Sequence, residues 1–197
     1  MDFVRSKTNC GLLATGQAGA QRILIVGPLG QGVGLMADAI TLAAARAGSP
    51  AGTFEFMRPG LARRTCAAVV RLGSSSHSAA GSADFLLAVG AAAALEARPL
   101  LAACGAGLAM VDARSSDLRR PMCDRLYDAR IRCWIAPGAA QAPLSRAWMM
   151  LGWLSGRLAW PLAGWREVLA DSVPRRMSMA ARVAFEQGRL IDCRAGR

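Results

Sequence analysis

The sequence predicts an α/β protein with a Rossmann-like, doubly wound, mostly parallel sheet and a C-terminal helical cap. Two observations lead to this fold class. Short apolar runs alternate with helical patterns along residues 22–136, and the first run ends in a glycine-rich turn that opens a helix. A chain of 197 residues can bury one such sheet between helical layers. We therefore expect a single domain over residues 22–197, with an α/β core at 22–136 and the cap at 137–190.

The first β–α unit has the clearest pattern. Residues 1–21 mix polar residues and glycine without periodicity, and we expect them to form a flexible arm. Arg22–Gly27 is a nearly continuous apolar run, typical of a strand buried on both faces of a parallel sheet. A helix should follow from Gly32 to Arg46, with Gly48 closing it. The predicted apolar face of this helix comprises Leu35, Ala39, Leu42 and Ala43.

The alternation continues to the end of the core. Further strands are expected at Thr53–Phe56, Ala67–Leu72, Phe85–Val89, Leu108–Val111 and Arg130–Ile135. A Ser/Gly-rich loop should occupy Gly73–Gly81, and a helix Ala91–Ala103. Repeated units of this length imply parallel strands joined by right-handed crossovers. Beyond Gly138 the strand pattern stops, and three cap helices are expected at Pro143–Leu158, Leu162–Ser172 and Arg175–Gly188.

Charge and hydropathy narrow the classes of function. The formal net charge is +11, but Lys7 is the only lysine and the arginines are spread along the chain without interleaved aromatic residues. This pattern favours an acidic protein partner or an anionic ligand over nucleic acid. The most apolar stretch, Ala147–Ala163, contains Arg157, two glycines and Pro161, so we interpret it as a buried helix and expect no membrane association. The N-terminus lacks a signal-peptide pattern, and the cytoplasm is the expected location.

The cysteines and the histidine do not form a metal-binding pattern. None of the six cysteines forms a C-x-x-C pair, and His77 has no cysteine at ligand spacing. We therefore predict no metal or iron–sulfur site in this chain. Most of the thiols should be reduced, and half of them should be packed on strands. The cysteines are Cys10, Cys66, Cys104, Cys123, Cys133 and Cys193.

The turn after the first strand is the strongest candidate site. The glycines at 27, 30, 32 and 34 allow a tight turn that exposes backbone amides at a helix N-terminus, which suits an anion or a phosphate. The spacing differs from the dinucleotide pattern G-x-G-x-x-G, because Pro28-Leu29 separates Gly27 from Gly30. A purely structural turn that permits close helix–sheet packing is an equal alternative.

The remaining polar residues do not assemble a catalytic set, and we assign no catalytic residue. Ser74–His77 has no nucleophile elbow beside it and is expected to be a solvated loop. Asp112 follows a strand at the carboxyl edge where α/β proteins bind ligands, or it caps the next turn; Asp84 lies at the opposite end of its own strand. The tryptophans of the cap are expected to be core and interface anchors: Trp148, Trp153, Trp160 and Trp165.

The order of these motifs resembles the gamma domain of pyruvate/2-oxoacid:ferredoxin oxidoreductases, and most closely the beta subunit of indolepyruvate oxidoreductase. That family opens with a strand and G-x-G-G-Q-G-V; this chain keeps Gly27, Gly30, Gln31, Gly32 and Val33, with Leu29 at the family's second glycine. Three further blocks agree over residues 22–190: Val70-Arg71-Leu72-Gly73 with a strand ending V-R-x-G, Asp84–Ala88 with A-D-L-L-L-G, and Met149–Gly152 with N-M-x-M-L-G.

One family segment is altered. In the family's E-V-H-G-M-x-Q-R-G-G stretch, Glu55 keeps the acidic position, Met57 replaces the histidine and Arg63-Arg64 replace the two glycines. Arg58 and Ala62 stand at the family's next glycine and its arginine. The loop has thereby changed from flexible to cationic. Three interpretations remain: a different substrate, a diverged complex, or a copy that is no longer active.

The resemblance implies a small subunit of a heteromeric oxidoreductase. Thiamine diphosphate and 4Fe-4S clusters would be held by a large partner subunit, coenzyme A would enter beside this domain, and ferredoxin would accept electrons. This chain would bind no cofactor alone; Gly27, Gly30, Gln31 and Gly32 would form the ligand-facing turn, with Glu55 and Arg71 near it. The alternatives are a free-standing Rossmann oxidoreductase with a nicotinamide or flavin nucleotide at Gly27–Gly34, and a non-catalytic basic scaffold.

Overall fold

A computed structural model describes residues 21–56, 65–73, 83–101, 108–112, 132–135, 143–158 and 160–191. Residues 1–20 of the predicted arm, the altered family segment at 57–64 and residues 74–81 of the predicted Ser/Gly-rich loop lie outside these ranges, whereas Gln21, predicted to belong to the arm, begins the first strand. The strands are β1 (Gln21–Pro28), β2 (Ala51–Phe56), β3 (Thr65–Leu72), β4 (Phe85–Val89), β5 (Leu108–Asp112) and β6 (Arg132–Ile135). The helices are α1 (Val33–Arg46), α2 (Ala91–Leu101), α4 (Pro143–Ser155), α5 (Leu162–Ser172) and α6 (Arg175–Arg189).

The strands form one mixed, mostly parallel sheet in the order β2-β3-β1-β4-β5-β6. The pairs β1–β4, β4–β5 and β5–β6 are parallel, which confirms the doubly wound α/β class. The prediction of a parallel unit between β2 and β3 was wrong: β3 runs antiparallel to both β2 and β1. Only residues 57–64 join β2 to β3, and a parallel crossover needs about a dozen residues or more.

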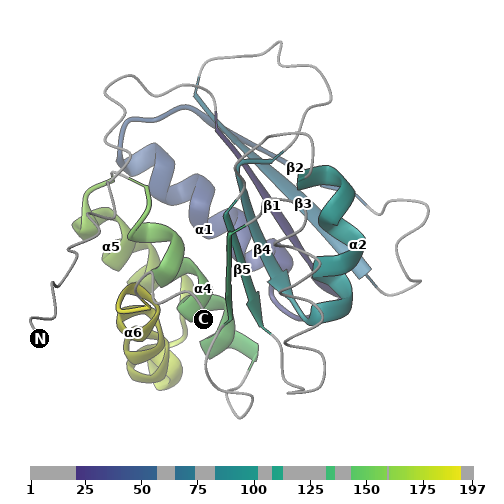
Figure 1. Cartoon of the computed structure of the whole chain (residues 1–197). Coiled ribbons are helices and arrows are strands. Elements are labelled where there is room, and N and C mark those ends of the chain that lie inside the picture. Colours follow the sequence, from purple (N-terminus) through teal and green to yellow (C-terminus); the bar gives the residue numbers. More distant parts are fainter. Residues whose placement is uncertain are drawn as a thin grey trace, which may run out of the picture.

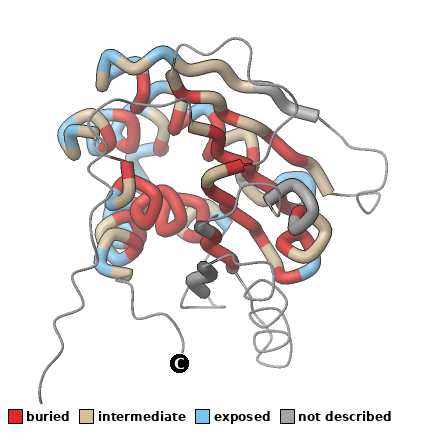
Figure 2. The backbone as a smooth tube through the Cα atoms, turned by 45° about the horizontal axis from the view of Figure 1, so that its top comes forward, coloured by how far each residue is buried: buried red, intermediate tan, exposed pale blue. Residues whose placement is uncertain are grey.

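The sheet is covered on both faces, as its apolar strands predict (Figure 1). The side chains of β1 point alternately to the two faces of the sheet. Ile23 and Ile25 pack with α1 and the C-terminal helices, whereas Leu24 and Val26 pack with α2. Figure 2 shows the resulting buried interior, with exposed residues on the outer sides of the helices. Six consecutive residues of β1 are buried, and the strand emerges at its carboxyl end, where Pro28 is exposed.

Helix α1 is rotated from the predicted apolar face. Ala39 and Ala43 are buried as expected, but Leu42 is 46% exposed, and Met36 and Ile40 point into the core instead. The alanine-rich sequence permits both faces, and contact with β1, β3 and α4 selects the one that buries the larger side chains. Arg46, in the last turn, forms an ion pair with Asp171 of α5 at 2.6 Å.

The C-terminal helices form a tightly packed cap on the α1 face of the sheet. Every residue of α4 from Arg146 to Ser155 is buried, and Trp148, Trp153 and Trp165 are at most 1% exposed. Trp160 stacks on Trp165 with ring centroids 5.7 Å apart. These contacts confirm that the tryptophans belong to the core. Searched over its described part, the chain contains no helix long and apolar enough to cross a membrane.

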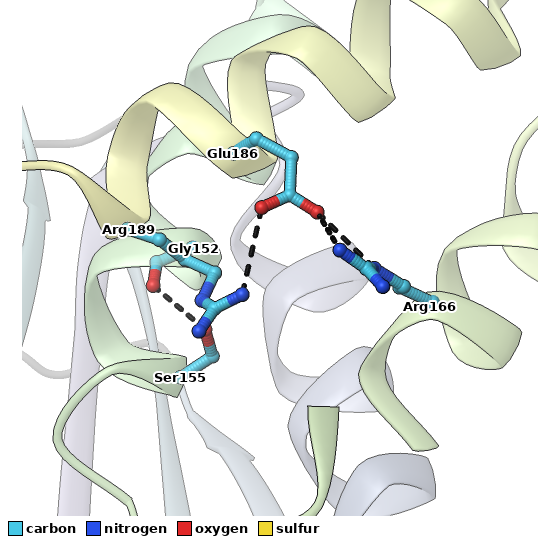
Figure 3. A network of polar contacts seen from close by, with 5 residues as sticks. All are labelled: Gly152, Ser155, Arg166, Glu186 and Arg189. Atoms are coloured by element: carbon cyan, nitrogen blue, oxygen red, sulfur yellow. Dashed lines mark hydrogen bonds and ion pairs between the residues drawn. The ribbon is translucent and has the colours of Figure 1, made fainter. Parts of the chain in front are cut away.

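Two glycines allow α4 and α6 to approach each other at the backbone. A Cβ atom at Gly152 would overlap the carbonyl oxygen of Phe185, and one at Gly188 would overlap the carbonyl oxygen of Met149. The Ser155 hydroxyl donates to the Gly152 carbonyl at 2.7 Å, so this segment of α4 has an added polar contact at the crossing (Figure 3). The Met-Met-Leu-Gly block therefore positions α6 on the cap.

Candidate functional site

The candidate site lies where the strand order of the sheet reverses. From β1 the chain passes to β2 and β3 on one side of the sheet, and then to β4, β5 and β6 on the other. The carboxyl ends of β1 and β4 are adjacent at this point, and helices α1 and α2 begin just after them. Open α/β sheets bind ligands in the crevice outside such a reversal. The fold therefore places the turn after β1 where a ligand site is expected.

The turn after β1 is tight and needs glycine at two positions. The Gln31 amide donates to the Pro28 carbonyl at 3.1 Å, closing a β-turn. Gly30, at the third position, has φ +80°, and Gly32, which precedes α1, has φ +90°. Both angles disfavour residues with a Cβ atom. Leu29, at the tip, is 70% exposed.

Helix α1 begins at this turn without a side-chain cap. The first helical hydrogen bond runs from the Met36 amide to the Gly32 carbonyl at 2.9 Å. The N-cap residue, Gly32, has no side chain to cap the preceding amides, and the first turn contains no acidic residue. Such a helix end has partial positive charge and suits an anionic group.

Gly27 has a packing role. A Cβ atom there would lie 2.8 Å from the Cβ of Val89 and 3.3 Å from the Cγ2 of Val33. The missing side chain lets β1, β4 and α1 meet closely beneath the turn. Cys66, opposite Gly27 on β3, donates its thiol hydrogen to the Gly27 carbonyl at an Sγ–O distance of 3.5 Å.

Arg146 is a residue of this site that sequence reasoning missed. It is only 2% exposed, and its guanidinium donates to the Gln31 Oε1 atom at 2.9 Å. The neighbouring Ala147 lies against Gly32, since a Cβ atom there would be 3.3 Å from that of Ala147. Helix α4 thus supports the turn through a partly buried hydrogen bond from a charged group and through an apolar contact. The available signal was an arginine inside an otherwise apolar helical stretch.

The two other residues predicted to lie near the turn, Glu55 and Arg71, are at opposite ends of the sheet. Glu55 pairs with Ala68, which pairs with Ile25, so its backbone lies at the same sheet edge as the turn and two strands away, about 10 Å. Arg71 pairs with Arg22 at the other end of β1. It lies roughly 17 Å along β3 from Cys66, the partner of Gly27. The prediction that Arg71 lies near the turn was wrong, because β3 runs antiparallel to β1.

The two aspartates occupy opposite edges of the sheet, as predicted. The Arg22 amide donates to the Asp84 Oδ2 atom at 2.7 Å, and the Asp84 amide donates to the Arg22 carbonyl at 2.9 Å. Asp84 therefore fastens the start of β4 to the start of β1. The backbone of Asp112 ends β5 at the carboxyl edge, paired with Val89. Among the described residues, no three His, Cys, Asp or Glu side chains are grouped to hold a metal ion.

The sheet order, the glycine turn and the helical cap together define the fold of the gamma subunits of keto/oxoacid:ferredoxin oxidoreductases. The chain is similar to the gamma subunit of a keto/oxoacid ferredoxin oxidoreductase from Geobacter sulfurreducens, with 19% identity, a TM-score of 0.67 and coverage of 85% of this chain and 95% of that one. It is also similar to the pyruvate oxidoreductase subunit PORC of Thermotoga maritima, with 17% identity, a TM-score of 0.65 and coverage of 87% and 96%.

A third similar structure contains this fold as one part of a longer chain. The 2-oxoglutarate:ferredoxin oxidoreductase of Magnetococcus marinus, solved with 2-oxoglutarate, coenzyme A and succinyl-CoA bound, has 19% identity and a TM-score of 0.62. The match covers 89% of this chain and 31% of that one. No protein-family model matches the sequence, and no curated protein matches it.

Proposed function

We propose that this chain is the small, coenzyme-free subunit of a cytoplasmic 2-oxoacid:ferredoxin oxidoreductase. It would support the oxidative decarboxylation of a 2-oxoacid to an acyl-CoA. Thiamine diphosphate and iron–sulfur clusters would be bound by a large partner subunit, and ferredoxin would accept the electrons. The resemblance of the turn to the indolepyruvate oxidoreductase beta subunit supports an aryl 2-oxoacid as the substrate.

The extent of the structural match carries this proposal. It covers 95% and 96% of two separate small subunits, and 85% and 87% of this chain. A match of that extent includes helices of the cap as well as the α/β sheet. Gly152 adds to the argument, because this residue of the Met-Met-Leu-Gly block is required for the contact between α4 and α6.

The turn after β1 would face a ligand in the assembled enzyme. The uncapped amides at the start of α1 favour an anionic group, such as a phosphate of coenzyme A. Gly30 is the residue best suited to close approach, because a Cβ atom added there would meet no atom of the described residues within 4 Å. Arg146 would hold the side chain of Gln31 in place beside the ligand. Glu55 would belong to the same edge, whereas Arg71, at the far end of β3, would not.

A free-standing nucleotide-binding oxidoreductase is the second candidate. The uncapped helix at the strand-order reversal favours it, because Rossmann enzymes bind the nucleotide pyrophosphate at that position. Calorimetric titration with NAD, FAD and coenzyme A distinguishes the two. Tight binding of a dinucleotide to the chain alone would favour this second function.

Coexpression tests the subunit proposal. The gene for a large subunit with thiamine and ferredoxin motifs should lie beside the gene for this chain. When both are expressed together, we expect them to elute from size exclusion as one complex with a fixed stoichiometry. Separate elution of two folded proteins would contradict the proposal.

A further inference from the structure

The side of α6 that faces away from α4 is an exposed surface of mixed apolar and cationic character. We call it the α6 outer face; with 3.6 residues per turn its members align on one side of the helix. They are Arg175, Arg176, Met179, Arg182 and Val183, together with Leu190, the residue that caps the C-terminal end of α6. The opposite side is buried in the cap through Ala181, Ala184, Phe185 and Gly188.

The apolar residues of this face are unusually exposed. Met179 is 73%, Val183 48% and Leu190 80% exposed. The other large apolar side chains exposed in the described ranges are Leu29 and Leu42, which lie on different elements. Met179 and Val183 lie about one turn apart and form a small apolar patch, and Leu190 follows about two turns further along the same face. Clustered exposed apolar residues mark interaction surfaces more often than isolated ones do.

The arginines of this face are not neutralised by the part of the chain that the structure describes. Arg175, Arg176 and Arg182 are exposed and form no ion pair there. Glu186 lies on the same side of the helix, but it is held between Arg166 of α5, at 2.8 Å, and Arg189, at 3.5 Å (Figure 3). This carboxylate is thus already matched by two guanidinium groups, and the described residues of the face carry a net positive charge.

We infer that the α6 outer face docks a partner protein that offers an apolar depression bordered by carboxylates. Arginine and methionine are enriched at protein interfaces, and complementary charge selects the partner and speeds encounter. Resting on the proposed function, the partner is the large thiamine-bearing subunit.

Two other occupants fit this face less well. A second copy of the chain would place like charges opposite each other, which disfavours self-association. A membrane surface would need a wide apolar face on α6, but the small and aromatic residues of the other side are already used against α4.

Charge reversal at the face tests the inference. Arg176→Glu and Met179→Glu, made separately in the full chain, should each weaken the Kd for the large subunit about ten-fold or more in calorimetric titration, as interface anchors do. Leu42→Glu, at an exposed apolar residue on α1, is the matched control and should change the Kd less than about two-fold. Unchanged thermal melts would establish that all three variants fold.

Each outcome decides the question. If the large subunit binds the wild type and both α6 variants equally, the docking face is wrong and the subunit proposal stands. If the large subunit does not bind the wild type, both proposals fail. If the wild type binds phosphatidylglycerol vesicles and the α6 variants do not, the face is a membrane contact and the protein-docking inference is overturned.

Discussion

At the residue scale, three glycines of one turn have three different physical roles. Gly27 is required because Val89 and Val33 occupy the space that a side chain would take. Gly32 is required by its φ of +90° and by contact with Ala147. Gly30 has a similar φ of +80° but open space around it. A substitution at Gly30 therefore tests ligand approach without disturbing the packing around the turn.

Alanine substitutions at Gly30 and Gly32 should differ in their effects. Both incur the cost of a left-handed backbone, about 1–2 kcal/mol of unfolding free energy. Gly32→Ala should lose more stability, because its Cβ would also press on Ala147 at 3.3 Å. Gly30→Ala should weaken coenzyme A binding to the assembled enzyme. Urea denaturation and calorimetric titration measure the two effects; equal stability losses with unchanged affinity would assign the whole turn to structure.

The Gln31–Arg146 hydrogen bond should be measurable as a coupling energy. Gln31→Ala removes an acceptor from a buried guanidinium and should cost about 1–3 kcal/mol of unfolding free energy. Arg146→Met keeps most of the side-chain volume and removes the charge, so the double variant should lose less than the sum of the single variants. The double-mutant cycle is measured by urea denaturation. If the loss of the double variant equals the sum of the two single losses, the contact contributes nothing to stability.

At the element scale, the sequence predicted helices better than strand directions. The cap helices α4, α5 and α6 are present where periodicity indicated them, although α4 ends at Ser155 instead of Leu158. The short β2–β3 connection forces β3 to run antiparallel to its neighbours. This direction places Arg71 at the end of the sheet opposite to the turn, where the sequence-based prediction did not expect it. Arg146 could not be assigned to the site, because its partner Gln31 is remote in sequence and only the packing of α4 brings them together.

The α4–α6 crossing should be the most sensitive element contact. Gly152→Ala or Gly188→Ala would force two helix backbones apart and should cost about 1–3 kcal/mol or more, the range for overpacked cores. Gly156→Ala is the matched control on the same segment, since a Cβ atom there would contact only the Trp153 carbonyl oxygen at an ordinary 3.6 Å. Thermal melts compare them. Similar melting temperatures for all three variants would contradict the proposed close approach.

At the scale of the whole molecule, the chain combines a ligand-type sheet edge with no assembled catalytic set among its described residues. The turn offers backbone amides, and the surrounding side chains Gln31 and Arg146 are engaged with each other. The cap provides a rigid support for the turn on one side and the α6 outer face on the other. These features suit a domain that shapes a site shared with a larger partner.

The purified chain alone should contain no iron–sulfur cluster. The Cys66 thiol is hydrogen-bonded to the Gly27 carbonyl, and no group of His, Cys, Asp or Glu side chains among the described residues could ligate a metal ion. We expect a colourless protein with no visible charge-transfer absorption and no stoichiometric iron by elemental analysis, even after anaerobic purification. A brown protein with stoichiometric iron would assign the chain an electron-transfer role of its own.

Reconstituted turnover tests the central claim most directly. The measurement is 2-oxoacid-dependent reduction of a viologen dye with coenzyme A present, carried out anaerobically on the chain alone, the large subunit alone, and both together. Indolepyruvate, pyruvate and 2-oxoglutarate serve as substrates. We expect no reduction by the chain alone and the highest rate with both subunits. Turnover by the chain alone, or a large-subunit rate that this chain does not change, would contradict its assignment as the supporting subunit.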